Sequence, residues 1–150
     1  MNTQYQNILL AVDGSKEAEY AFKKAITLSL QNNAHLKICN VIDTSIMTTT
    51  TFDSISLTVS ESMLDYGKKL VSNYVDLAKE QGVTNVSGLI EQGNPKTIIS
   101  KIIAPKHNID LIICGATGLN TIERLLIGSV SEHIIRYASC DVLVIRNNND

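Results

Sequence analysis

The stretch Ile8-Leu9-Leu10-Ala11-Val12-Asp13-Gly14-Ser15 decides how the rest of the sequence is interpreted. Five consecutive apolar residues, with no polar residue at alternate positions, are typical of a strand that is covered on both faces of a parallel sheet. Ser15 is a predicted helix N-cap, and the apolar residues of the segment 15–31 that follows recur with helical spacing. A buried strand that leads directly into a helix is the first half of a βαβ unit.

The same alternation continues to the end of the chain. Four more short apolar runs are predicted strands: residues 36–42, 86–90, 109–114 and 142–145. Three more helical patterns lie between them, over residues 56–81, 94–105 and from Gly128 onward. Strands that alternate with helices predict right-handed crossovers and a parallel sheet with helices on both faces. We therefore expect an α/β open sandwich that forms a single domain over residues 1–150.

Several residues mark the predicted ends of these helices. Gly82 is a stop for the second helix, and Asn94 is an N-cap followed by proline at the first helical position. Pro105 is predicted to end the third helix, and Ser129 and Glu132 have the spacing of a capping box for the last. The polar segment 43–55 is expected to be a flexible loop, and residues 147–150 a polar tail.

Composition excludes several classes of protein. The chain has 150 residues, 44% of them apolar, and a net charge of −2 with no tryptophan, which does not favour a nucleic-acid partner. No apolar run approaches the roughly 20 residues of a membrane span, and the N-terminus has no leader pattern. The three cysteines form no C-x-x-C pair, so we expect reduced thiols in a cytoplasmic protein.

Two features at the predicted strand ends are candidates for ligand binding, because an open α/β sheet binds ligands there. Asp13 follows the first strand, and Gly115 and Gly118 bracket the loop after the fourth, nine residues before Gly128 and Ser129. Glycine at these loop positions allows positive φ and lets backbone N–H groups approach an anion closely, and the helix start suits a phosphate. The alternative is that the glycines only shape a loop and that Ser129 only caps its helix.

The spacing Gly115-x2-Gly118-x9-Gly128-Ser129 resembles the ATP-binding signature of the universal stress proteins. The likeness extends over nearly the whole chain, from residues 8–15 through 110–115 to the closing 138–146. It implies a Rossmann-like domain, similar to the adenine nucleotide alpha hydrolases, with strand order 3-2-1-4-5. It also implies binding of ATP or a related adenine nucleotide, with Asp13 near the ribose or a phosphate-bound Mg²⁺.

The resemblance assigns the binding residues position by position. They are Ala11, Asp13, Val41, Cys114, Gly115, Thr117, Gly118, Gly128, Ser129, Val130 and Ser131. Thr117 departs from the family pattern, since many members carry a basic residue or histidine there, and threonine offers a hydroxyl without a charge. The resemblance further implies a homodimer through residues 142–145, an apolar run at a sheet edge that would otherwise promote aggregation.

Three functions remain open from the sequence. The first is a regulatory protein that binds an adenine nucleotide and has no dedicated catalytic residues. The second is a slow Mg²⁺-dependent ATP hydrolase, although the Ser-Gly-Gly-x-Asp-Ser, His-x-Gly-His and Gly-x-Ser-x-Gly motifs are all missing. The third is a dimeric interaction module that needs no nucleotide. A phosphoacceptor switch matches poorly, because Asp13, Glu91 and Arg146 stand where such a protein needs an acidic pair, an aspartate and a lysine.

Overall fold

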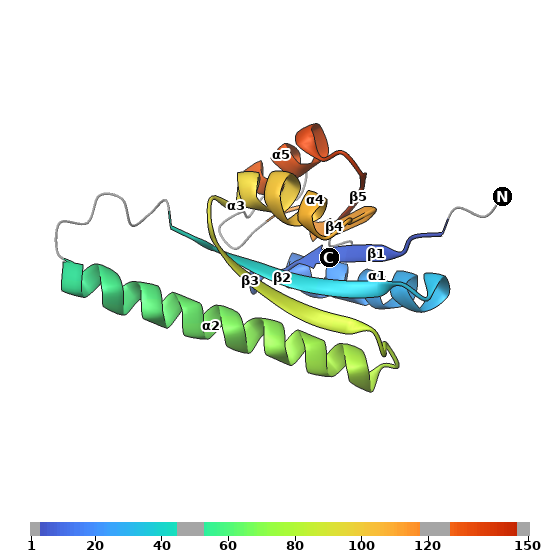
Figure 1. The fold of residues 1–150 in the computed structure, drawn as a ribbon, viewed down its shortest axis with the longest axis horizontal. Helices are drawn as coiled ribbons and strands as arrows, with labels where there is room; N and C mark the ends of the chain where they lie inside the picture. Colours follow the sequence, from blue (N-terminus) through green and yellow to red (C-terminus); the bar gives the residue numbers. More distant parts are fainter. Residues whose placement is uncertain (1–3, 45–52, 118–126, 147–150) are drawn as a thin grey trace.

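The structure is a computed structural model that describes residues 4–44, 53–117 and 127–146. Its centre is a five-stranded sheet in which every neighbouring pair is parallel, and its order β3-β2-β1-β4-β5 confirms the prediction (Figure 1). The strands are β1 (Asn7–Ala11), β2 (His35–Asp43), β3 (Val86–Gly93), β4 (Leu111–Gly115) and β5 (Asp141–Ile145). The chain runs outward from β1 on one side and continues from β4 on the other. The strand order therefore reverses between β1 and β4.

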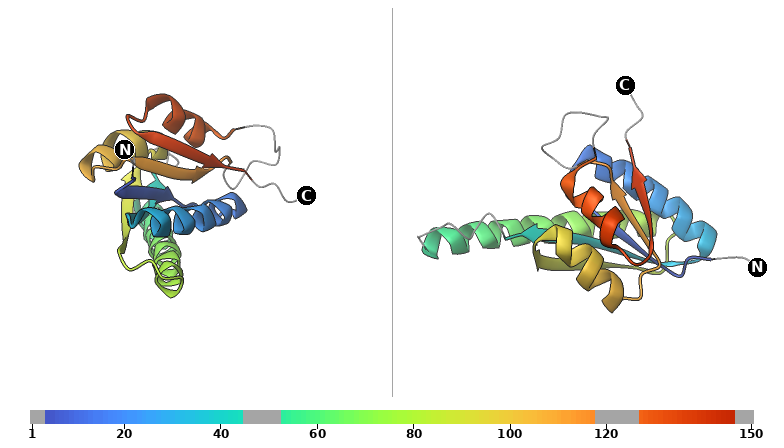
Figure 2. Two further views of the ribbon diagram at one scale, coloured as in Figure 1. Left: turned by 90° about the vertical axis from the view of Figure 1, so that its right-hand side faces the viewer. Right: turned by 90° about the horizontal axis from the view of Figure 1, so that it is seen from above.

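Helices cover both faces of this sheet, as expected (Figure 2). One face carries α1 (Lys16–Asn32) and α2 (Asp53–Glu80). The other carries α5 (Ser129–Tyr137) and a continuous helical segment made of α3 (Pro95–Thr97), the π-helix η2 (Ile98–Ile103) and α4 (Ala104–Lys106).

Two hydrophobic clusters, one on each face, explain why the first strand is apolar throughout. Ile8 and Leu10 point into the cluster beneath α1 and α2, where the rings of Phe22 and Tyr74 lie 4.8 Å apart. Leu9, between them in β1, points into the cluster beneath η2 and α5. Successive side chains of a strand alternate between faces, so a strand covered on both sides must be apolar at every position.

Most predicted helix ends are confirmed. Ser15 caps α1, because its Oγ accepts a hydrogen bond from the N–H of Ala18 at 3.2 Å. Asn94 caps α3 in the same way through the N–H of Lys96, at 3.1 Å. Gly82 has a φ of +99° just after α2, a conformation that favours glycine and stops the helix.

Two of the predicted helix ends are wrong. The capping box does not form: Gly128 is the N-cap of α5 without a side-chain bond, and Ser129 is already helical. The helical segment continues past Pro105 to Lys106 and contains a π-helix, in which the N–H of Ala104 donates to the carbonyl of Ile99. A wider turn relieves the clash that a proline ring makes with the carbonyl four residues earlier.

The strands β2 and β3 also extend beyond their apolar runs, because Asp43 pairs with Gly93. Residues 91–93, which were expected to follow the third strand, therefore belong to it. The predicted loop over 43–55 falls largely outside the described residues, although α2 already begins at Asp53. Residues 147–150 also lie outside them. In the described part of the chain, no helix is long and apolar enough to cross a membrane.

Candidate functional site

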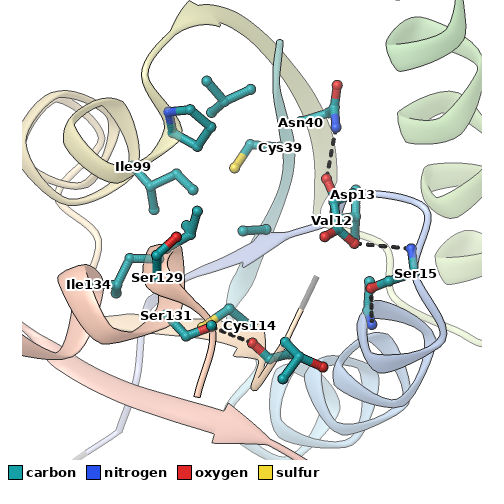
Figure 3. A pocket seen from close by; sticks show the side chains of 18 of the residues that line it. Val12, Asp13, Ser15, Cys39, Asn40, Ile99, Cys114, Ser129, Ser131 and Ile134 are labelled. Atoms are coloured by element: carbon teal, nitrogen blue, oxygen red, sulfur yellow. Dashed lines mark hydrogen bonds between the residues drawn. The ribbon is translucent and has the colours of Figure 1, made fainter. Parts of the chain in front are cut away.

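A cavity of about 370 Å³ lies at the carboxyl ends of β1 and β4, where the strand order reverses (Figure 3). Every predicted binding residue that the structure describes lines it. These residues are Ala11, Asp13, Val41, Cys114, Gly115, Thr117, Gly128, Ser129, Val130 and Ser131. Gly118 lies outside the described residues. The volume falls within the range of small-molecule sites.

The turn between β1 and α1 forms one side of the cavity, which we call the acidic side. Gly14 has a φ of +85°, and this bend lets the Oδ1 of Asp13 accept a hydrogen bond from the N–H of Ser15 at 3.0 Å. The Nδ2 of Asn40 donates to the carbonyl of Val12 at 2.8 Å and holds the chain just before the turn. Asp13 is thereby fixed at the cavity by bonds on both sides of the bend, as Figure 3 shows.

The end of β4 and the start of α5 form the opposite side, which we call the donor side. The Oγ of Ser131 donates to the carbonyl of Gly115 at 2.6 Å, and the N–H of Gly128 donates to the carbonyl of Ala116 at 2.7 Å. The first bond within α5 runs from the N–H of Glu132 to the carbonyl of Gly128. The N–H groups of the turn before it have no partner in the helix and lie at the positive end of its dipole, so they can bind an anion.

The glycine of the donor side has a different purpose from the predicted one. Within the described residues, positive φ among glycines occurs at Gly14, Gly82 and Gly93, so Gly115 does not use the positive φ that a glycine allows. A β-carbon at Gly115 would instead lie 2.6 Å from the Cβ of Glu17 and 3.0 Å from its carbonyl carbon. Gly115 therefore lets α1 pack closely against the end of β4, and the reading of Ser129 as only a cap is also wrong.

An apolar wall completes the cavity, and the sequence analysis missed it. Pro95 comes from α3, Ile99 from η2 and Ile134 from α5, and Cys39 of β2 lies beside them. Pro95 follows β3 directly, so the rule that ligands bind at strand ends could have identified it. Nothing in the sequence marks Ile99 or Ile134, since both also have the spacing of ordinary core residues.

The electrostatics of the cavity are simple. Its lining within the described residues contains the carboxylates Asp13 and Asp43, two thiols, and no lysine, arginine or histidine. Burial raises the pKa of Cys39 to about 12. Burial also raises the pKa of Cys114, to about 11, against an opposing hydrogen bond with Ser131. Both thiols are therefore protonated at neutral pH, and an anion in this cavity would meet backbone and hydroxyl donors rather than cationic side chains. No cluster of three metal-binding side chains occurs among the described residues.

Comparison with known proteins places this geometry in a family. The model of the universal stress protein family matches residues 4–146. The chain belongs to this family. A protein from Staphylococcus haemolyticus named for the same family is 46% identical over 142 residues, which cover 95% of this chain and 85% of that protein.

Solved structures of universal stress proteins share the fold. The protein UspA from Lactobacillus plantarum superposes with a TM-score of 0.89 at 32% identity, over 97% of this chain and 100% of that one. A family member in complex with cAMP has a TM-score of 0.66 at 24% identity, over 96% of this chain and 98% of its own. One from Archaeoglobus fulgidus in complex with dAMP has a TM-score of 0.62 at 20% identity, over 96% of this chain and 100% of its own.

Proposed function

We propose that this universal stress protein binds an adenine nucleotide in the cavity between β1 and β4, and that binding regulates its shape or its choice of partner. ATP with Mg²⁺ is the ligand that we propose first. The observation that carries the proposal is the arrangement of three unlike surfaces around one cavity: the donors at the start of α5, the Asp13 carboxylate and the apolar wall.

Each surface matches one part of a nucleotide. The N–H groups at the start of α5 suit phosphate oxygens, because an unpaired helix start binds anions through its donors and its dipole. The wall of Pro95, Ile99 and Ile134 suits the flat apolar faces of a base. Asp13 suits a ribose hydroxyl or a Mg²⁺ ion that bridges phosphate oxygens. Two family members of the same fold were solved in complex with cAMP and dAMP, which supports an adenine nucleotide as the class of ligand.

The proposal favours binding over turnover. A hydrolase must position a water molecule with a base, and Asp13 would already be engaged by the ribose or the metal ion. The thiols Cys39 and Cys114 are poor candidates for a nucleophile because burial raises the pKa of each. Slow hydrolysis through Asp13 and Mg²⁺ is the competing proposal, and measurement of phosphate release from ATP distinguishes the two.

Calorimetric titration tests the binding proposal. We expect ATP with Mg²⁺ to bind with a dissociation constant in the micromolar range, about −8 kcal/mol. Val130→Trp should weaken binding at least about tenfold, since the indole occupies the cavity beside the donors. Ile135→Trp is the matched control, because Ile135 lies on the same helix, is 48% exposed and does not line the cavity. A folded protein that releases no heat up to millimolar nucleotide would overturn the proposal in favour of a nucleotide-independent module.

We also propose that the protein is a cytoplasmic homodimer through the outer edge of β5. This strand pairs with β4 alone among the described strands. Its half-buried side chains, 142–145, pack against both hydrophobic clusters. The unpaired backbone groups of such an edge can pair antiparallel with those of a second copy related by a two-fold axis. Sedimentation should give twice the 16.4 kDa of one chain at micromolar concentration, and a monomer at that concentration would contradict the dimer.

A further inference from the structure

Asn40 lines the cavity, yet its polar groups face the protein. Its Nδ2 donates to the carbonyl of Val12 at 2.8 Å, directly before Asp13. Its Oδ1 points toward α2, where a β-carbon added at Gly67 would lie only 2.7 Å away. Asn40 therefore joins three segments that are distant in sequence: the end of β1, the middle of β2 and one turn of α2.

The same turn of α2 contacts the acidic side at a second point. Tyr66 is 56% exposed, but its hydroxyl lies against Gly14, where it occupies the space that a β-carbon would need. Gly67 is the first buried residue along α2 among those whose burial is described. The part of the helix before it extends past the carboxyl ends of β2 and β3 (Figure 1). Tyr66 and Gly67 thus lie where α2 first packs on the sheet, and there they contact Gly14 and Asn40 of the acidic side.

We infer that Asn40 is a positioning residue, which sets the orientation of Asp13 toward the ligand by holding the carbonyl of Val12, and that Gly67 of α2 fixes Asn40 in turn. The inference rests on the proposed nucleotide site and deepens it. Asn40 need not touch the nucleotide, since its donor bonds to the protein. Packing at Gly67, on the sheet face that carries α1 and α2, then controls the affinity of the cavity for the nucleotide.

The physical argument is geometric. A carboxylate on a bend can reach a ribose or a phosphate-bound cation only if the chain before the bend is fixed, and a displacement of about 1 Å costs much of such an interaction. The turn itself is fixed on its far side by Ser15, whose N–H binds Asp13. On its near side, two bonds tie Val12 to β2: its N–H donates to the carbonyl of Cys39 at 2.9 Å, and its carbonyl accepts from the Nδ2 of Asn40. The bond from Asn40 is the one on the carbonyl directly before Asp13, so its removal lets the peptide that joins Val12 to Asp13 rotate and changes the direction of Asp13.

A double-mutant cycle tests this role. We expect Asn40→Ala to raise the dissociation constant for ATP with Mg²⁺ about tenfold in the wild-type background and less than about twofold in the Asp13→Asn background. An equal factor in both backgrounds would overturn the inference, because a merely structural residue weakens binding whether or not Asp13 carries its charge. Thermal unfolding of each variant accompanies the titrations.

Two glycine variants test the path through α2 without altering the cavity lining. Gly67→Ala pushes on Asn40, whereas Gly88→Ala pushes α2 away from β3 through the side chain of Val71. Both perturb the packing of α2 on the sheet, but only the first involves Asn40. We expect Gly67→Ala to raise the dissociation constant at least about threefold and Gly88→Ala to leave it within about 1.5-fold. Equal effects of the two variants would overturn the inference that Gly67 acts on the cavity through Asn40.

The wild-type titration separates this inference from the proposed function. If the wild-type protein binds no adenine nucleotide, the proposed function fails and the positioning role fails with it. If the wild type binds and the cycle is additive, only the role of Asn40 is overturned. If Asn40→Ala does not fold, the comparison of Gly67→Ala with Gly88→Ala decides the question.

Discussion

The acidic side and the donor side of the cavity are built in different ways. On the acidic side, Asp13 bonds to Ser15 and Ser15 bonds to Ala18, so two successive hydrogen bonds lie within six residues of chain. On the donor side, Ser131 reaches back to Gly115, and Gly115 is packed against Glu17, nearly one hundred residues earlier. The hydrogen bonds that shape the turn of the first side are local, and Asn40 and Tyr66 support that turn from distant segments. The contacts of the second side form only when three distant segments meet.

This difference predicts how each side fails. A change on the acidic side should alter ligand affinity while the fold persists, because local turns reform around small substitutions. A change on the donor side should cost stability and affinity together, because the same contacts assemble the fold and the site.

The largest effect is expected for Gly115→Ala. Its β-carbon would collide with the Cβ and the backbone of Glu17, so α1 must move. Overpacking of this kind typically destabilises by about 1–3 kcal/mol, and we expect about 2 kcal/mol in urea unfolding together with loss of nucleotide binding. Gly88→Ala is the control, because its β-carbon meets a side-chain methyl of Val71 instead of a backbone. An equal loss of stability in the two variants would contradict the contrast.

An intermediate effect is expected for Asp13→Asn, and its sign depends on the metal ion. The amide oxygen can still accept the bond from Ser15, so stability should change by less than about 0.5 kcal/mol. With Mg²⁺, the loss of a negative ligand should weaken ATP binding roughly tenfold. Without Mg²⁺, the loss of repulsion between carboxylate and phosphates should strengthen it. Titrations in Mg²⁺ and in EDTA check both signs, and weakening in both buffers would place Asp13 on the ribose alone.

The smallest effect is expected for Cys39, whose buried thiol lines the cavity. Burial raises the pKa of Cys39 to about 12, so in alkaline solution the unfolded chain loses this proton while the folded chain keeps it. The stabilising contribution is complete below the unfolded pKa and is lost as the pH rises from there toward the folded value. Between pH 7 and pH 9 we expect Cys39 to account for about 0.5 kcal/mol of lost stability. Urea unfolding of wild type and Cys39→Ala at both pH values, under reducing conditions, measures this share; an unchanged pH dependence in the variant would contradict it.

Much of the fold could be predicted because its signals are local. The run 8–12, the caps Ser15 and Asn94 and the stop at Gly82 each depend on neighbours along the chain, and the structure confirms them. The capping box at Ser129 was wrong although its spacing was right, since Gly128 already has the extended backbone of an N-cap. The π-helix was missed because no simple residue pattern distinguishes it from the α-helix.

The candidate site divides in the same way. Strand-end positions such as Asp13 and Gly115 follow from the alternation of strands and helices, and the structure brings both to one cavity. The role of Gly115 in packing was missed, because a sequence does not distinguish a glycine that uses positive φ from one that lets a helix approach a strand closely. Ile99 and Ile134 were missed because a cavity wall and an ordinary core position have the same residue types and spacing. Asn40 was missed because its partner Val12 lies 28 residues earlier in the sequence.

The order of elements, the parallel sheet and the family could be predicted from the order of residues alone, because apolar periodicity and glycine spacing are local patterns. The packing of the folded chain was needed to show which face each helix covers, why Gly115 must lack a side chain and how α2 reaches Asp13 through Gly67 and Asn40. Those features depend on distances between segments that are far apart in sequence. Such distances follow from how the two faces of the sheet are packed, and residue type alone does not encode them.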